Sequence, residues 1–343
     1  MLKRFVLTLL LLSAPFAWAR PIKVVVSQSA YRPIVEFIGG DKVEVHQIVN
    51  GNEDPHIVRP KPSFAVLLRD ADLYVTTGMD LEMWSPGLVD MSGNPNIRSG
   101  QKGYVSASAG VKVIDEPITI SRSEGDVHIY GNPHIHTSPL NGKVIAENIA
   151  VGLKRVAPEH AAYFDANLQR FKAEIDRRMF GEELCRLLGG KLLTDLAQNG
   201  KLMAFLEHKQ YQGSPLITRL GGWMKAALPL RGKKIVAYHK TIDYFANLFG
   251  IEIVAFMEPK PGIPPTPGHV SEVIETMRKE GVKVMWAENY FDIGQVKRVA
   301  ERVGARTVIV ALGPGGQPGM NTYFDIFDIW IRELLKAFEE AQP

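Results

Sequence analysis

Short β-branched runs alternate with amphipathic stretches along the first third of the chain. Runs at Ile22–Ser27, Val43–Val49 and Leu73–Thr77 have the length and composition of buried strands, and Tyr31–Ile38 has helical periodicity. Strands that alternate with helices indicate a parallel sheet with right-handed crossovers. We therefore expect residues 20–157 to form an α/β lobe.

The same alternation returns near the carboxyl end. Strands are expected at Lys234–Tyr238, Glu252–Phe256, Val282–Trp286 and Thr307–Ala311, followed by a closing amphipathic helix over Asn321–Glu340. This pattern predicts a second lobe with a parallel sheet flanked by helices, within residues 181–343. Between the lobes, apolar residues at helical spacing predict a long helix over residues 158–180.

The amino-terminal residues predict export. Lys3 and Arg4 precede an apolar run, and Ala17-Trp18-Ala19 is a small-residue cleavage pattern. These features are typical of a signal peptide over residues 1–19, cleaved after Ala19; an uncleaved anchor is the alternative. No Cys stands at the cleavage site, so a lipid anchor is not expected. The mature protein is expected in the periplasm of a host with two membranes.

Composition limits which partners and which metal-ligating residues the protein can use. The formal net charge is +3, which includes Lys3 and Arg4, so nucleic acid is not expected as a partner. Cys185 is the only cysteine, which excludes an internal disulfide and a site built from several thiolates. A metal would be held by histidine, aspartate and glutamate: three histidines, or two with a carboxylate, suit Zn²⁺, and added carboxylates allow Mn²⁺.

A pair of histidines between two prolines is the first candidate metal-binding motif. His134 and His136 lie between Pro133 and Pro139, and each proline disfavours helix at the residue before it. The run is therefore expected to be extended, with the two imidazoles on opposite faces. Only one of them can easily enter a given site.

Two further histidines follow expected strands. His56 comes after Asp54-Pro55, past the strand that ends at Val49, and His239 follows Lys234–Tyr238. Ligands bind at the carboxyl edge of open parallel sheets, so both positions fit a site. A single histidine there is more often structural, but three from two lobes favour joint metal binding by His56, His134 and His239.

Three ordered motifs resemble those of the substrate-binding proteins of zinc and manganese ABC transporters. They are Asp54-Pro55-His56-x-x-x-Pro60-x-Pro62-Ser63, Asn132-Pro133-His134-x-His136-x-x-Pro139 and Ala237-Tyr238-His239-Lys240-x-x-x-Tyr244-Phe245-Ala246. The resemblance implies two lobes joined by one long rigid helix, and a metal cation clamped between them as transported ligand. It also implies a membrane permease as partner, a monomer and no catalytic cofactor.

The sequence departs from this family pattern in several places. The usual Asp before Thr322-Tyr323 is missing, so Glu288 is our candidate for the fourth ligand, with Asp292, water or an open position as alternatives. Residues 181–230 lengthen the connection to the third motif and are interpreted as a helical insertion; His208 within it is not expected to bind metal. The loop 121–131, with His128, is too short for the histidine-rich metal-scavenging loop of some relatives.

Three functions compete. The first is a binding protein that captures a divalent metal, zinc before manganese, and delivers it to an ABC permease. The second is an exported zinc hydrolase using the same histidines with an open fourth position, although the sequence contains no H-E-x-x-H motif. The third is an adhesin or storage protein on the same scaffold. We expect the first, and hence no enzymatic activity.

Overall fold

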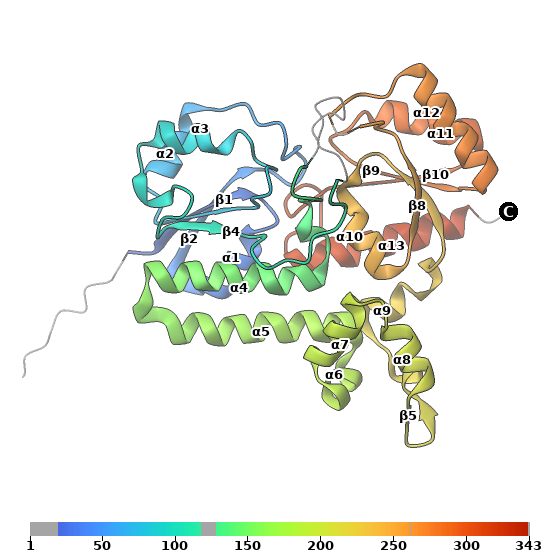
Figure 1. Ribbon diagram of the computed structural model, residues 1–343, viewed down its shortest axis with the longest axis horizontal. Helices are drawn as coiled ribbons and strands as arrows, with labels where there is room; N and C mark the ends of the chain where they lie inside the picture. Colours follow the sequence, from blue (N-terminus) through green and yellow to red (C-terminus); the bar gives the residue numbers. More distant parts are fainter. Residues whose placement is uncertain (1–19, 118–127, 261, 342–343) are drawn as a thin grey trace, which may run out of the picture.

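Two parallel sheets form the centres of two lobes in this computed structural model, which describes residues 20–117, 128–260 and 262–341 (Figure 1). The predicted signal peptide lies outside the described residues, as does most of the loop that precedes His128. None of the helices in the described ranges combines the length and the apolar character that a membrane crossing needs.

The first sheet has the strand order β2-β1-β3-β4, with every neighbouring pair parallel. Its central strand is buried on both faces, as expected where helices cover both sides of a sheet. Helices α1 and α4 pack on one face, and α2 and α3 on the other. The bounds are β1 Ile22–Gln28, α1 Arg32–Gly39, β2 Val43–Val49, α2 Pro62–Arg69, β3 Leu73–Thr76, α3 Ser85–Ser92, β4 Tyr104–Ser106 and α4 Pro139–Val156.

The second sheet has the order β10-β9-β7-β8 and is also entirely parallel. Both sheets therefore confirm the expected α/β architecture. The elements of this lobe are β7 Lys234–Ala237, α10 Asp243–Phe249, β8 Glu252–Phe256, α11 Pro267–Glu280, β9 Val284–Glu288, α12 Ile293–Val303, β10 Arg306–Val310 and α13 Tyr323–Glu340.

A long helix, α5 (Ala161–Phe180), runs beneath α4 of the first lobe (Figure 1). It packs against α1 and α4 of the first lobe and against α9 (Gly222–Ala226), which precedes the second sheet. Phe171 of α5 contacts Tyr323 and Phe324 at the start of α13. One buried cluster accordingly extends from the first sheet through α5 into the second sheet, so the lobes share apolar core.

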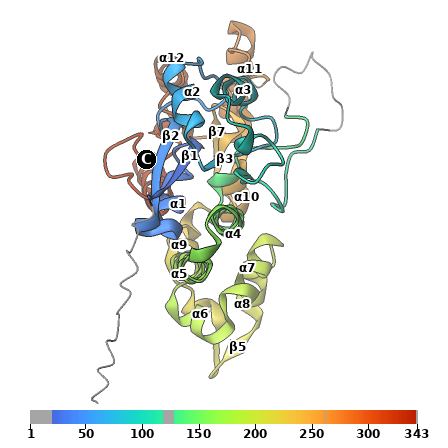
Figure 2. The ribbon, with the colours of Figure 1, turned by 90° about the vertical axis from the view of Figure 1, so that its left-hand side faces the viewer.

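The chain between α5 and α9 forms a separate projection. Figures 1 and 2 both show it below α5, away from the sheets. The first part of the predicted insertion is two helices that meet at Gly189, whose φ of +77° favours glycine. The elements are α6 Glu182–Leu188, α7 Gly190–Gln198, α8 Leu202–His208, and the short strands β5 Gln210–Tyr211 and β6 Ser214–Pro215.

Candidate metal centre

Four imidazoles gather between the lobes. One ring nitrogen from each of His56, His128, His134 and His239 lies within 4.8 Å of the other three. His56 follows β2 and His239 follows β7, while His128 and His134 lie before α4. Three of the four therefore come from the first lobe and one from the second. The structure brings together the three histidines that the sequence indicated and adds His128.

An Asx turn orients His56. Oδ1 of Asp54 accepts hydrogen bonds from the backbone N–H of His56 at 2.9 Å and from its Nδ1 at 2.7 Å. Trp84 donates its indole N–H to the carbonyl of Pro55 at 2.9 Å and so holds the turn from outside. With Nδ1 donating to a carboxylate, Nε2 of His56 keeps its lone pair and lies 3.2 Å from Nε2 of His128.

The second motif repeats this arrangement with an amide. Oδ1 of Asn132 accepts from the backbone N–H of His134 at 3.0 Å and from its Nδ1 at 2.8 Å. The expected extended run is wrong: Ile135–Thr137 forms a single 3₁₀ turn, because the carbonyl of His134 accepts from the N–H of Thr137. His136 nevertheless is not part of the cluster and packs edge-on against Tyr31.

The second lobe presents His239 two residues after the end of β7. Backbone hydrogen bonds join Tyr238 to Trp286 and to Glu258, on the two neighbouring strands or their ends, and fix the position of the following residue. Nδ1 of His239 donates to Oε2 of Glu258 at 2.5 Å. The Nε2 atoms of His134 and His239 are both buried without a hydrogen-bond partner among the described residues.

Burial favours the neutral form of three of these rings, those of His128, His134 and His239. It lowers the pKa of His128 to about 3 and the pKa of His134 well below its ordinary value, and the neighbouring imidazoles add to both shifts. Burial also lowers the pKa of His239, although the hydrogen bond to Glu258 opposes it. Burial acts to raise the pKa of Asp54, but the hydrogen bonds from His56 outweigh it and lower that pKa. Neutral imidazoles with free lone pairs are what a metal ion requires.

A turn brings His128 to the cluster, and sequence reasoning had assigned it no ligand role. The N–H of Gly131 donates to the carbonyl of His128 at 2.9 Å, and the N–H of Asn132 donates to the carbonyl of Ile114. Gly131 adopts φ +86°, which favours glycine. The available signal was that His128 stands three residues before Gly131 and six before His134. The sequence predicts no strand or helix directly before His128 that would indicate where its side chain lies.

Glu288 does not join the four histidines. It is the last residue of β9 and is buried, and its Oε1 accepts from Thr241 and from the indole of Trp286. Its Oε2 has no partner among the described residues. Burial is the main cause that raises the pKa of Glu288 to about 7. Its role as a ligand therefore stays a prediction.

The loop that lacks the expected Asp has a different contact. The N–H groups of Leu312 and Gly313 donate to the carbonyl of Gly51 at 3.0 and 3.2 Å. A Cβ on Gly51 would lie 2.0 Å from the carbonyl oxygen of Gly313. This loop of the second lobe thus sits backbone against backbone on the turn that leads to His56.

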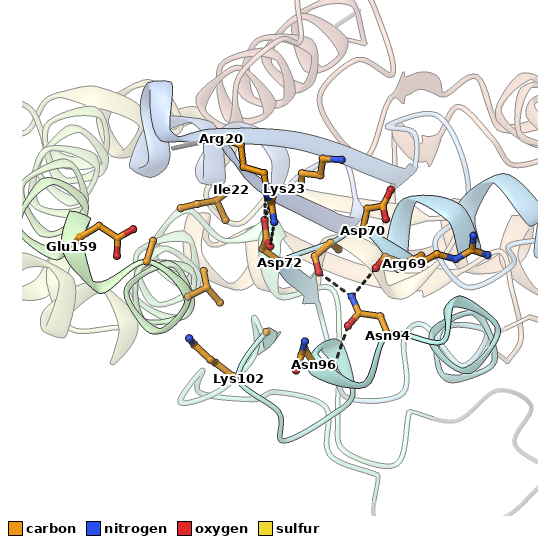
Figure 3. A pocket seen from close by; sticks show the side chains of 14 residues that line it. Arg20, Ile22, Lys23, Arg69, Asp70, Asp72, Asn94, Asn96, Lys102 and Glu159 are labelled. Atoms are coloured by element: carbon orange, nitrogen blue, oxygen red, sulfur yellow. Dashed lines mark hydrogen bonds and ion pairs between the residues drawn. The ribbon is translucent and has the colours of Figure 1, made fainter. Parts of the chain in front are cut away.

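A cavity of about 980 Å³ lies at the opposite edge of the first sheet, near the starts of β1, β3 and β4 (Figure 3). Two of its charged groups are paired with each other: Arg20 forms two 2.7 Å hydrogen bonds to Asp72. The amide of Asn94 donates to the carbonyls of Leu68, Arg69 and Ala71. None of the four clustered histidines lines this cavity.

Comparison with known families places the protein in a class of metal-binding components of ABC transporters. The family model described as zinc-uptake complex component A, periplasmic, matches residues 24–178 and 217–337. This match spans most of the chain, and the protein belongs to that family, which is a transporter-component family and not an enzyme class. The unmatched residues 179–216 overlap the predicted insertion, whose bounds of 181–230 stay a prediction.

Individual relatives are distant. The manganese ABC transporter substrate-binding lipoprotein PsaA of Streptococcus mitis is 24% identical over 289 residues, covering 83% of this chain and 78% of that protein. The iron-binding protein YfeA of Yersinia pestis is 23% identical over 327 residues, covering 94% and 88%.

Solved structures agree on the fold. A crystal structure of ZnuA superposes with a TM-score of 0.67 at 21% identity, covering 92% of this chain and 99% of that one. A manganese-bound periplasmic metal binding protein from Candidatus Liberibacter asiaticus superposes with a TM-score of 0.63 at 19% identity, covering 92% and 98%.

Proposed function

We propose that this protein captures Zn²⁺ in the periplasm, with His56, His128, His134 and His239 as its ligands, and delivers it as a monomer to an ABC permease. The observation that carries the proposal is the convergence of four imidazole nitrogens from two lobes within 4.8 Å. Zinc is the cargo here, not a resident cofactor, and the protein is proposed to have no catalytic activity.

The donor set favours zinc over manganese. Imidazole nitrogen suits Zn²⁺, Cu²⁺ and Ni²⁺, whereas Mn²⁺ prefers carboxylate and carbonyl oxygen. The 3.2 Å separation of Nε2 in His56 and His128 is close to the ligand–ligand spacing of a tetrahedral site with Zn–N bonds of about 2.0 Å. His128 thus supplies the fourth donor that the missing Asp would otherwise provide.

The orienting groups supply the charge that the ligands lack. Four neutral imidazoles leave the dication uncompensated, but the carboxylates of Asp54 and Glu258 accept hydrogen bonds from Nδ1 of two of them. Such outer carboxylates fix the tautomer and raise the basicity of the ligating nitrogen. The two negative charges of these carboxylates would balance the two positive charges of the cation.

A hydrolase reading has less support. Zinc hydrolases keep an open coordination position for water, whereas four imidazoles would fill a tetrahedral site. Glu288 does not join the four histidines, and its Oε1 is held by Thr241 and Trp286. We keep Glu288 as the reserve ligand, to be tested by Glu288→Gln alongside the histidine variants.

Calorimetric titration of the metal-free mature protein tests the proposal. We expect Zn²⁺ to bind at one site with submicromolar affinity and Mn²⁺ to bind much more weakly. Substitution of His128 or His134 by alanine should lower zinc affinity by more than roughly 10- to 100-fold, which is the loss typical of removing a group that only hydrogen-bonds a ligand.

The matched control is His208→Ala, which removes an exposed histidine whose Nδ1 bonds only its own helix. This variant should bind zinc like the wild type. The proposal fails if the wild type does not bind Zn²⁺ with submicromolar affinity. Unchanged zinc binding in His128→Ala would remove His128 from the ligand set, and a large loss in Glu288→Gln would add Glu288.

A further inference from the structure

Asn132 makes contacts in both lobes at once. Its Oδ1 accepts from the backbone and ring of His134 in the first lobe. Its Nδ2 donates to the carbonyl of Lys240 at 2.8 Å and lies 3.3 Å from Oδ2 of Asp243, both in the second lobe. The same Nδ2 lies 3.2 Å from Oδ2 of Asp115. The side chain is 3% exposed.

The two ends of this amide are not interchangeable. The backbone N–H of His134 can only donate, so the atom facing it must be the oxygen; the carbonyl of Lys240 can only accept, so the atom facing it must be the N–H₂ group. A carboxylate could serve the first partner but not the second. Asp54, which orients His56 through the same Asx turn, has no such second set of contacts among the described residues.

The environment of Nδ2 is rich in acceptors. Besides the Lys240 carbonyl, the carboxyl groups of Asp115 and Asp243 face it, and burial with Asp115 nearby raises the pKa of Asp243 to about 8. The Lys240 ammonium is the cationic group that acts on Asp243, and Tyr244 donates its hydroxyl to the backbone carbonyl of Asn132 at 2.8 Å. A carboxylate at position 132 would oppose the Lys240 carbonyl, which can only accept, and would add a third carboxyl group beside Asp115 and Asp243.

We propose that Asn132 is a positioning residue that couples the orientation of the His134 ring to the seating of the second lobe, and that it must be an amide to do so. Zinc affinity then depends on the polarity of the Asn132–Asp243 contact as well as on the ligands. This inference rests on the proposed function to the extent that His134 binds the metal.

Zinc binding by Asn132→Asp, measured by chelator competition, tests the coupling. If orienting His134 were the only role, a carboxylate would keep or strengthen zinc binding, because it raises the basicity of the ring. The coupling predicts the opposite: a loss of about 10- to 100-fold, since the second oxygen would oppose the Lys240 carbonyl and crowd a third carboxyl group against Asp115 and Asp243. The double variant Asn132→Asp/Asp243→Asn restores a donor opposite the new carboxylate and should recover most of the loss.

Two further variants complete the experiment. Asn96→Asp adds the same charge at an exposed position in the first lobe and should bind zinc like the wild type. Asp243→Ala keeps the amide but removes one of its partners, and should lower zinc affinity while the metal-free protein retains its circular dichroism spectrum. This variant keeps the test valid if Asn132→Asp does not fold.

The outcomes separate the two proposals. Wild-type zinc affinity in Asn132→Asp or in Asp243→Ala would overturn the coupling, as would a double variant no better than the single one. A wild type that binds no zinc would instead overturn the proposed function.

Discussion

Glu82 is a buried carboxyl group that links two strands of the first sheet. Its Oε1 accepts from the hydroxyl of Ser27, at the end of β1, at 2.6 Å, and from the N–H of Thr77, just past β3, at 2.9 Å. Burial raises the pKa of Glu82 above its ordinary value, although these hydrogen bonds oppose the shift. The carboxyl group is thus more readily protonated in the folded protein than in the unfolded chain.

Because of this shift, the contribution of Glu82 to the free energy of unfolding should depend on pH. Because the folded state holds the proton more tightly than the unfolded state, Glu82 contributes less to stability as pH rises from about 4.5 toward its folded pKa. Glu82→Gln keeps the accepting oxygen without a charge. We expect the free energy of unfolding of this variant to exceed that of the wild type at pH 7.

Urea unfolding of the metal-free protein at several pH values measures this difference. The advantage of Glu82→Gln should shrink toward pH 4, where the wild-type carboxyl is protonated in both states. An advantage that is constant with pH would show that Glu82 is not responsible. Since only the difference between the two proteins is used, the titration of the histidines cancels.

At the scale of elements, the strands were predictable and the turns were not. The runs that became β1, β2 and β8 were recognisable from β-branched residues alone, with ends within a residue. The 3₁₀ turn Ile135–Thr137 was missed because proline rules govern the residues before Pro133 and Pro139, and leave those between them free to bond locally.

The contact between Gly51 and the loop after β10 gives a prediction at this scale. Gly51→Ala would place a methyl group 2.0 Å from the Gly313 carbonyl, so the two loops must separate. We expect a loss of about 1–3 kcal/mol in the free energy of unfolding, as for other overpacked sites. Zinc affinity should also fall, because the turn at Gly51 leads to His56.

Gly87→Ala is the matched control. Gly87 lies within α3 in open space, where alanine favours the helix by roughly 0.5–1 kcal/mol. Unfolding by urea should therefore move the two variants in opposite directions. Equal stability of Gly51→Ala and the wild type would mean that the lobes accommodate the methyl group without cost.

For the whole molecule, the sequence predicted two lobes and three of the four clustered histidines. His56 and His239 were recoverable because each follows a strand, whose direction fixes where the next residues point. His128 was not, because its position depends on a chain reversal closed by Asn132 and Ile114, and no periodic pattern encodes such a reversal. Because His128 was not recognised as a donor, the absence of the usual Asp led to Glu288 as the expected fourth ligand, since this carboxylate follows a predicted strand.

The three-to-one division of the imidazoles between the lobes has a consequence for rates. The first lobe alone presents three nitrogens, enough to capture an ion before the second lobe contributes its single one. Association should then depend on the three imidazoles of the first lobe, and the lifetime of the complex on His239.

Stopped-flow measurements of zinc binding and release can separate these two steps. His239→Ala should leave the association rate constant near that of the wild type and accelerate dissociation, whereas His134→Ala should slow association as well. Equal effects of the two variants on association would contradict this order of events. If the order holds, a permease that withdraws one imidazole converts a long-lived complex into one that releases its ion within the time of docking.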